Sequence, residues 1–221
     1  MAEGTLYIGT RRYSSWSLRG WLAVRHALLD VEQVVIPLAG GVTEAVKAAT
    51  GGATVPYLEH RGARIWESLA ICEYCAEADP ALWPRNRPAR AWARAIAAEM
   101  HAGFRALRQS MPMSLFRDAA GAGRNTETLA DIARIERLWA ETRATYGADG
   151  PYLFGAAFTN ADIMFAPVVC RFLTYQPELS AVSHAYCEAV RADMMIAEWY
   201  RLAAAEPAEW RLPGYEEPVA A

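Results

Sequence analysis

The pattern of predicted elements changes abruptly along this chain, and this change restricts the possible folds most. Up to about residue 78, short β-branched or aromatic runs alternate with segments of helical periodicity. A proline-rich segment, DPALWPRNRPAR at residues 79–90, follows. Beyond this segment we identify only helical patterns. The sequence therefore predicts an α/β domain followed by an all-helical domain.

The first part of the chain predicts a mixed sheet. Its elements follow the order strand, helix, strand, helix, strand, strand, helix, at residues 5–8, 17–29, 33–38, 43–50, 55–60, 63–66 and 68–78. The opening strand–helix–strand unit is a parallel crossover, which is right-handed by the usual rule. The turn at Arg61-Gly62 closes an antiparallel hairpin, and the run QVVIPL at 33–38 predicts a buried strand. This order is the thioredoxin-like arrangement.

The second part predicts helices throughout, at about 88–109, 127–146, 159–174, 181–193 and 195–205, with an irregular tail after them. Of the 44 alanines, 12 lie in residues 1–80 and 32 in residues 81–221. Alanine is the strongest helix former, so this asymmetry agrees with the change in pattern. We therefore divide the chain into a domain at 1–80, a linker at 81–88 and a helical domain at 89–221.

Composition excludes several other classes of protein. The chain has 221 residues, 53% of them hydrophobic, and a net charge of -3. Its basic residues are scattered, which argues against a dedicated nucleic-acid binder. No apolar run approaches the roughly 20 residues of a membrane span, and no secretory signal is visible at the N-terminus. Four cysteines are too few for a disulfide scaffold, so we expect a reduced, cytoplasmic protein.

The cysteine pair Cys72-x-x-Cys75 suggests redox or metal chemistry, but its position argues against both. Reactive cysteines of a thioredoxin-like fold lie at the start of the first helix, whereas this pair lies inside the helix predicted at 68–78. No second pair or nearby histidine completes a zinc site, and the four histidines are widely separated. We predict inert buried thiols and no metal.

Three serines, Ser14, Ser15 and Ser17, lie between the first strand and the first helix. A helix N-terminus carries unpaired N–H groups and a partial positive charge, which favour an anion. A serine hydroxyl there could donate to a thiolate or an oxyanion. The alternative is that these serines only cap the helix, as serine commonly does.

Two further positions could contact a ligand. Val55 precedes Pro56 at a strand start, where its backbone could pair with an extended peptide-like ligand; the alternative is an ordinary edge proline. Glu67 and Ser68 stand where the hairpin ends and a helix begins. Glu67 could bind an ammonium group and Ser68 a carboxylate, whereas the alternative for Ser68 is a simple cap.

The segment FTNADIMFAPVV at 158–169 predicts a stable helix start. Thr159 and Asp162 form a variant of the capping box, and Phe158 and Ile163 a hydrophobic staple. We assign this motif a role in folding rather than in catalysis.

Together, four motifs resemble the cytosolic glutathione transferases, and most closely the zeta-like, serine-type members. They are YSSWSLR (13–19), ATVPYL (53–58), ESLAICEY (67–74) and FTNADIMFAPVV. The resemblance covers both parts of the chain. It implies a thioredoxin-like domain that binds glutathione, an all-helical domain that shapes the electrophile pocket, and a homodimer.

The resemblance also implies roles for individual residues. The backbone of Val55 would bind the cysteinyl part of glutathione, with Pro56 in the cis form. Glu67 and Ser68 would bind the γ-glutamyl group. Glutathione is then a co-substrate, and no metal is implied.

The zeta-type pattern reads Ser-Ser-Cys-Ser-Trp-Arg, and alignment on Arg19 places Ser14 at the catalytic serine. Trp16 then stands where zeta-type members carry a cysteine, which argues against their isomerase reaction and against disulfide exchange. The segment between the first strand and Ser14 is longer than in the family pattern. Ser15 therefore stays open as the alternative.

These residues predict a glutathione transferase that acts on a small electrophile. A cysteine thiol has a pKa of about 8.5, and a hydrogen bond from Ser14 would stabilise its thiolate. Besides Ser15, the alternative donor is Tyr13 or Tyr7, by analogy with tyrosine-type members. The alternatives are a binding or regulatory module without turnover, or a zeta-like isomerase.

The electrophile pocket is predicted between Ser14 and the first helix of the second domain. His101, Phe104 and Arg108 lie at i, i+3 and i+7, on one helical face. With Trp16 they would form a largely apolar pocket with a few polar groups. The alternative for Phe104 is an ordinary position in the core.

Overall fold

A computed structural model describes residues 2–38 and 43–217 of the chain. Its N-terminal part contains β1 (Gly4–Gly9), α1 (Ser15–His26), β2 (Glu32–Ile36), α2 (Glu44–Thr50), β3 (Tyr57–His60), β4 (Ala63–Trp66) and α3 (Ser68–Ala78). The strands form one sheet in the order β2-β1-β3-β4. β1 is parallel to β2 and antiparallel to β3, which is antiparallel to β4. The predicted crossover, hairpin and mixed sheet are confirmed.

The prediction of a buried strand at 33–38 is wrong. β2 is an edge strand, and Glu32, Gln33 and Val34 are exposed. Only Ile36 is buried. An apolar run does not distinguish a central strand from an edge strand, and the strand ends before Pro37, whose nitrogen has no hydrogen to donate to a ladder.

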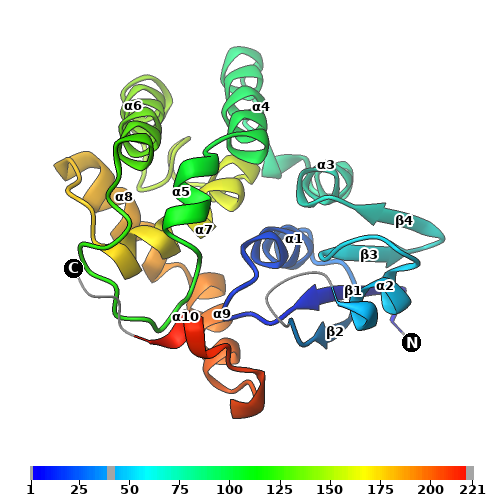
Figure 1. The fold of residues 1–221 in the computed structure, drawn as a ribbon. Coiled ribbons are helices and arrows are strands. Elements are labelled where there is room, and N and C mark those ends of the chain that lie inside the picture. The colour runs from blue at the N-terminus through cyan, green and yellow to red at the C-terminus, as the bar shows by residue number, and fades with distance from the viewer. Residues whose placement is uncertain (1, 39–42, 218–221) are drawn as a thin grey trace.

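The C-terminal part is helical. After the 3₁₀ turn η1 (Pro80–Leu82) it contains α4 (Arg87–Ala102), α5 (Arg105–Ser110), α6 (Thr126–Tyr146), α7 (Asn160–Tyr175), α8 (Ala181–Ala192) and α9 (Met194–Ala204). α1 and α3 pack side by side over the sheet, and α1 contacts α7 of the helical part (Figure 1). The fold is thus a thioredoxin-like domain followed by a helical domain, as predicted. None of the helices described in the structure is long and apolar enough to cross a membrane.

The single helix predicted at 88–109 is two helices. Phe104 adopts a left-handed backbone conformation, with φ of 59°. Gly103 has no room for a side chain, because a Cβ atom there would lie 2.8 Å from the carbonyl oxygen of Glu99. Arg108 donates from Nε to the Gly103 carbonyl (3.0 Å) and from Nη2 to that of His101 (3.3 Å). Because the apolar face continues across the break, periodicity alone could not reveal it.

The segment after α9 is not an irregular tail. It forms a second 3₁₀ turn, η2 (Ala208–Trp210), and a short helix, α10 (Pro213–Glu216). In Figure 1, α10 lies between the helical part and the chain that enters α1. The segment therefore returns to the N-terminal domain.

The motif predicted at the start of α7 is present. The buried Asp162 carboxylate accepts hydrogen bonds from the backbone N–H of Thr159 (2.8 Å) and from its hydroxyl (2.8 Å). It also accepts from the Leu153 N–H (3.0 Å) and the Tyr186 hydroxyl (3.1 Å). These bonds tie the helix start to neighbouring segments, in agreement with a folding role.

All four cysteines are buried and form no disulfide. The Cys72-x-x-Cys75 pair lies inside α3, and burial raises the pKa of the Cys75 thiol to about 12. The thiolate, which is the reactive form, is therefore disfavoured. The prediction of buried thiols is confirmed.

Candidate active site

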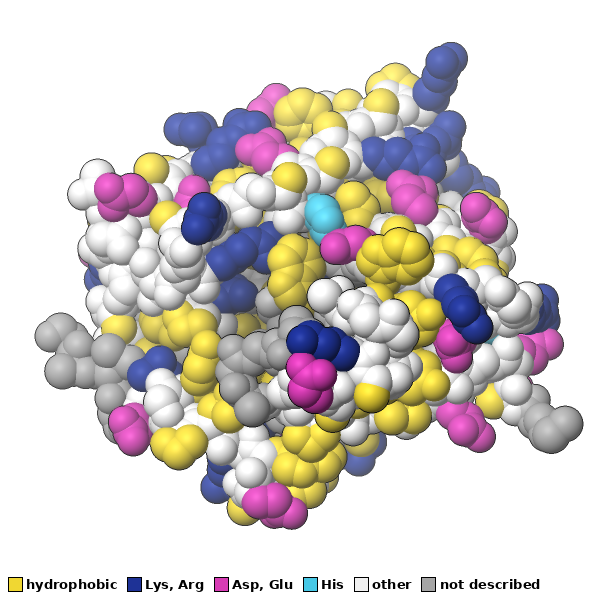
Figure 2. Space-filling view, turned by 45° about the vertical axis from the view of Figure 1, so that its right-hand side comes forward, with side chains coloured by type: hydrophobic (Ala, Val, Ile, Leu, Met, Phe, Trp, Pro, Cys, Tyr) yellow, Lys and Arg dark blue, Asp and Glu magenta, His cyan; other side chains and the backbone are white. Residues whose placement is uncertain are grey.

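A cavity of about 520 Å³ lies where the N-terminal ends of α1 and α3 meet the segment before β3. This volume is typical of small-molecule sites. The residues that line it are Tyr13, Ser14, Ser15, Trp16, Leu38, Val46, Thr54, Val55, Pro56, Glu67, Ser68, Leu212 and Tyr215. Figure 2 shows a face of the molecule with a hollow near its middle, where hydrophobic and basic side chains meet. Acidic and basic side chains both occur over the rest of this face, the basic ones mainly in the upper part of the view.

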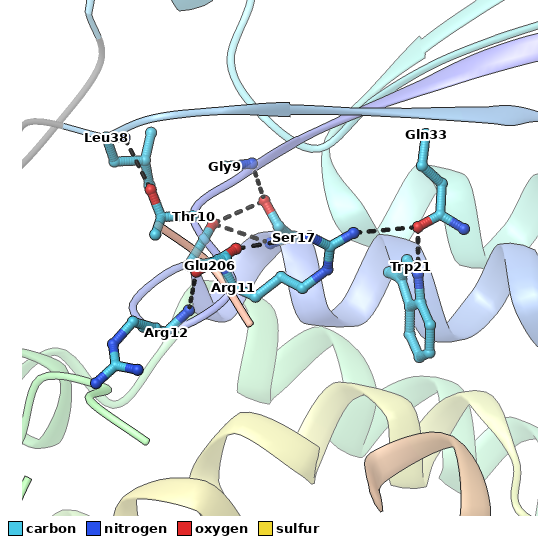
Figure 3. Close-up of polar contacts among 10 residues, drawn as sticks. Gly9, Thr10, Arg11, Arg12, Ser17, Trp21, Gln33, Leu38 and Glu206 are labelled. Carbon is cyan, nitrogen blue, oxygen red and sulfur yellow. Dashed lines mark hydrogen bonds and ion pairs between the residues drawn. The ribbon is translucent and has the colours of Figure 1, made fainter. Parts of the chain in front are cut away.

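The N-terminus of α1 is satisfied by its own side chains. Ser14 is the N-cap, and its oxygen accepts a hydrogen bond from the Ser17 N–H (3.3 Å). The Ser14 and Ser17 hydroxyls are 2.7 Å apart, and the Ser17 oxygen accepts from the Gly9 N–H (2.9 Å; Figure 3). Both cavity serines, Ser14 and Ser15, are mostly buried. The strand β1 thus fixes the serine that caps the helix.

The N-terminus of α3 is different. Glu67, the N-cap residue of α3, has φ of 73°, and its side chain forms no capping hydrogen bond with the described part of the chain. Ser68 is 1% exposed, and its hydroxyl has no hydrogen-bond partner among the described residues. Strained backbone and unsatisfied buried polar groups are concentrated at functional sites. This helix end is therefore suited to an anionic ligand.

The Val55–Pro56 peptide bond is cis, as the resemblance implied. Val55 precedes β3, and no hydrogen bond of its backbone is formed to another part of the described chain. Close packing holds this turn against α1, because a Cβ atom at Gly20 would lie 2.7 Å from that of Pro56. The Val55 backbone can therefore pair with an extended ligand.

The cavity brings together most of the residues predicted from the sequence, namely Ser14, Ser15, Trp16, Val55, Pro56, Glu67 and Ser68. The first two come from the start of α1, and Glu67 and Ser68 from the start of α3.

Three predicted pocket residues do not line this cavity. His101 and Arg108 instead contact Trp16, which lines the cavity. The centre of the Trp16 ring lies 5.3 Å from the centre of the His101 ring and 4.6 Å from the guanidinium carbon of Arg108. His101 Nε2 also lies 3.4 Å from Glu67 Oε2, and burial lowers the pKa of His101. Phe104 is buried at the start of α5.

Sequence reasoning missed the contribution of the C-terminal segment. Leu212 and Tyr215 line the cavity, together with Tyr13. The Tyr13 hydroxyl donates to Glu216 and accepts from the Leu212 N–H (3.0 Å). The apolar and aromatic residues in WRLPGY (210–215) were the available signal that this segment packs on the protein.

The tyrosines considered as alternatives to serine differ in position. Tyr13 lines the cavity, but its hydroxyl already donates a hydrogen bond to Glu216, and burial raises the pKa of Tyr13. Tyr7 lies in β1, paired with Tyr57 across the strands, and does not line the cavity. Within the described ranges, no group of three or more His, Cys, Asp or Glu side chains is arranged to hold a metal ion.

Residues 13–78 match the family model for the glutathione S-transferase N-terminal domain. No curated protein matches the sequence. Solved structures show the fold of the whole chain. A glutathione transferase homolog from Burkholderia gl BGR1, with bound glutathione, superposes with a TM-score of 0.68 at 21% identity over 92% of this chain and 99% of its own.

Two other structures with bound glutathione have the same fold. A homolog from Drosophila mojavensis gives a TM-score of 0.67 at 20% identity, over 99% of this chain and 100% of its own. The theta class enzyme of the citrus canker pathogen Xanthomonas axonopodis pv. citri gives 0.64 at 21% identity, over 94% and 99%. The chain therefore has the glutathione transferase fold, and its first domain carries the sequence pattern of that family's N-terminal domain.

Proposed function

We propose that this chain is a glutathione transferase that activates the glutathione thiol for attack on a small electrophile. One observation carries the proposal: within the described residues, the buried hydroxyl of Ser68 has no hydrogen-bond partner and lies at a helix end without a side-chain cap, in a cavity shared with Ser14 and Ser15. Leaving a buried hydroxyl unsatisfied costs about 1–3 kcal/mol. A ligand that accepts its hydrogen bond recovers this free energy.

The cavity has complementary groups for the γ-glutamyl and cysteinyl parts of glutathione. The Ser68 hydroxyl and the first N–H groups of α3 would bind the γ-glutamyl carboxylate. The Glu67 side chain, which is 54% exposed, would bind the ammonium group. The Val55 backbone would pair with the cysteinyl residue. In this orientation the thiol points toward the N-terminus of α1.

The hydroxyl pair of Ser14 and Ser17 supports a mechanism for thiol activation. Each hydroxyl can both donate and accept, so their 2.7 Å contact can be polarised in either direction. When Ser17 donates to Ser14, the Gly9 N–H stabilises the Ser17 oxygen and the Ser14 hydrogen can point to the sulfur. The thiol proton leaves to solvent, and Ser14 stabilises the remaining thiolate.

The size of this effect is sufficient for catalysis at neutral pH. A charge-assisted hydrogen bond is worth about 1.5–3 kcal/mol. Since one pKa unit corresponds to about 1.4 kcal/mol, Ser14 can lower the pKa of the thiol by about one to two units from 8.5. The helix dipole of α1 adds to the effect.

Ser15 is the alternative donor. It is the first residue of α1 and lines the same cavity, and its hydroxyl forms no hydrogen bond within the described part of the chain. It could donate to the thiolate without first breaking an internal bond.

The test compares Ser14→Ala and Ser15→Ala with the wild type in conjugation of glutathione to a small chromogenic electrophile. Replacement of the serine that donates to the thiolate should lower kcat/KM about tenfold or more. Ser180→Ala is the control, because Ser180 caps α8 through similar contacts with Ser183 (3.3 Å to its N–H, 3.1 Å to its hydroxyl) outside this cavity, although its hydroxyl also lies 2.8 Å from Glu136 Oε1.

Each outcome has a clear meaning. Unchanged rates in both serine variants would contradict serine activation. Failure of the wild type to bind immobilised glutathione would contradict the proposed function as a whole. Binding without conjugation would favour the non-catalytic binding module.

A further inference from the structure

The segment after α9 holds the loop that leads into α1. Glu206 is 8% exposed, and its carboxylate accepts hydrogen bonds from the backbone N–H groups of Arg11 (2.7 Å) and Arg12 (3.4 Å; Figure 3). Glu206 lies 195 positions after Arg11. A buried carboxylate from the C-terminal segment thus satisfies two adjacent backbone donors of the N-terminal domain.

These two donors belong to the turn that presents Ser14. The Thr10 carbonyl accepts from the N–H groups of Tyr13 (3.2 Å) and Ser14 (3.0 Å). On its other side, the Thr10 hydroxyl accepts from the Leu38 N–H (2.9 Å; Figure 3). The Thr10 contacts leave the N–H groups of Arg11 and Arg12 without an acceptor inside the turn, and Glu206 supplies it.

The Arg11 side chain strengthens this arrangement. Its Nη1 lies 3.6 Å from the Glu206 carboxylate, and its Nη2 donates to Gln33 (3.4 Å). The same Gln33 oxygen accepts from the Trp21 indole (2.8 Å). The guanidinium also lies 5.7 Å from the centre of the Trp199 ring. One side chain therefore connects β2, α1 and α9 next to the loop.

A second carboxylate holds the following residues. Glu216 forms two hydrogen bonds with the Arg12 guanidinium (3.0 and 2.9 Å) and accepts from the Tyr13 hydroxyl. Paired bonds of this kind restrict direction as well as distance. The whole segment from Arg11 to Tyr13 is thus held by the C-terminal segment, and Ser14 follows directly.

We propose that Glu206 is a positioning residue for thiol activation, which fixes Ser14 by binding the backbone of the preceding loop. The proposal rests on the proposed function. Glu206 does not line the cavity, so it acts through the loop rather than on a ligand. A displacement of about 1 Å at a reacting group can cost about a hundredfold in rate.

The experiment uses Glu206→Ala and Glu206→Gln in the full chain. Three quantities are measured: the dissociation constant for reduced glutathione by calorimetry, the pKa of the bound thiol from the ultraviolet absorbance of the thiolate, and kcat for conjugation. Glu198→Gln is the matched control, because Glu198 joins α9 to Arg25 near the far end of α1 through an ion pair of 2.8 Å.

In Glu206→Ala, the thiol pKa should rise toward its value in free glutathione, and kcat should fall about tenfold, while glutathione affinity changes by less than about threefold. In Glu206→Gln the effect should be smaller, because the amide oxygen still accepts from Arg11. If Glu206→Ala does not fold, the same three measurements on Glu206→Gln provide the test. Glu198→Gln should resemble the wild type in all three measurements.

An unchanged thiol pKa and kcat in Glu206→Ala and Glu206→Gln would overturn the inference while leaving the proposed function intact. A weaker affinity for glutathione with an unchanged thiol pKa would also overturn the inference, because this result would indicate general loosening of the site. A wild type that does not bind glutathione would instead contradict the proposed function itself.

Discussion

α1 and α3 both begin at the same cavity, but their first turns are built in opposite ways. At α1, the Ser14 oxygen accepts from Ser17, and β1 supports that pair through Gly9. At α3, no side chain caps the helix, and the Ser68 hydroxyl has no partner in the described structure. A helix end that is satisfied internally can hold a donor in place, whereas one left unsatisfied gains most from a ligand.

The start of α7 provides a third helix end for this comparison. It lies outside the cavity, and the Asp162 carboxylate there accepts bonds from Leu153, Thr159 and Tyr186. Its capping carboxylate accepts more hydrogen bonds than the caps of the other two, although Asn160 Oδ1 has no partner among the described residues, and this helix start lines no ligand site that we identify. It therefore shows what a purely structural helix start contributes.

The largest effect is expected at this third helix end. Asp162→Ala leaves buried donors unpaired and should lower the free energy of unfolding by about 3–5 kcal/mol. Urea unfolding measures the loss. Asp193→Ala, which removes the more exposed cap of α9, should cost about 1 kcal/mol and serves as the control. Equal losses in the two variants would show that the Asp162 bonds add nothing beyond a simple cap.

At α3, Ser68→Ala should change binding and stability in opposite directions. Glutathione affinity should fall about tenfold or more, because a hydrogen bond to a carboxylate is lost. The free energy of unfolding without ligand should stay the same or rise by about 1 kcal/mol, because an unsatisfied buried hydroxyl is removed. Calorimetry and urea unfolding measure the two. A clear loss of stability would mean that Ser68 has a structural role instead.

At α1, Ser14→Ala should show the opposite balance. Loss of the N-cap should lower the free energy of unfolding by about 1 kcal/mol. Glutathione affinity should change little, and the pKa of the bound thiol should rise. If Ser14→Ala weakens glutathione binding as strongly as Ser68→Ala does, the distinction between the two helix ends fails.

The smallest effect concerns the C-terminal contact beside α1. Burial raises the pKa of Glu216, but the hydrogen bonds from Arg12 and Tyr13 outweigh it, so that this pKa lies below its ordinary value of 4.5. A lowered acid pKa means that the contact stabilises the fold above about pH 4.5 and is lost as the pH falls through the lowered value. The protection of residues 208–217 against hydrogen exchange, measured relative to the intrinsic rate at each pH, should therefore fall in acid.

Glu216→Gln is the control for this acid effect. It cannot ionise, so the protection of the same segment should be lower than in the wild type at neutral pH and should not fall further in acid. Equal protection of the segment in both proteins at all pH values would contradict a role for the Glu216 carboxylate.

The elements that the sequence predicted correctly are those with local signals. The alternation of strands and helices, the serine cap of α1 and the capping motif of α7 each follow from residues a few positions apart. The position of Glu67 and Ser68 at the start of α3 follows in the same way, because a hairpin ends where a helix begins.

The features that could not be predicted depend on distant residues or on single backbone angles. The edge position of β2 is set by the strand order, and the break after α4 by the left-handed conformation of Phe104. The hydrogen bond between Glu206 and the Arg11 backbone joins residues near opposite ends of the chain, and no sequence pattern in either segment predicts it. That the buried Ser68 hydroxyl has no partner among the described residues likewise becomes visible only in three dimensions.

The most direct test of the central claim is calorimetric titration of the wild type with glutathione and with cysteinylglycine, which lacks the γ-glutamyl group. If α3 binds that group, glutathione should bind saturably at one site per chain. Cysteinylglycine should bind at least about a hundredfold more weakly, because two charge-assisted interactions are lost. Equal affinity for the two peptides, or no binding of glutathione, would contradict the account.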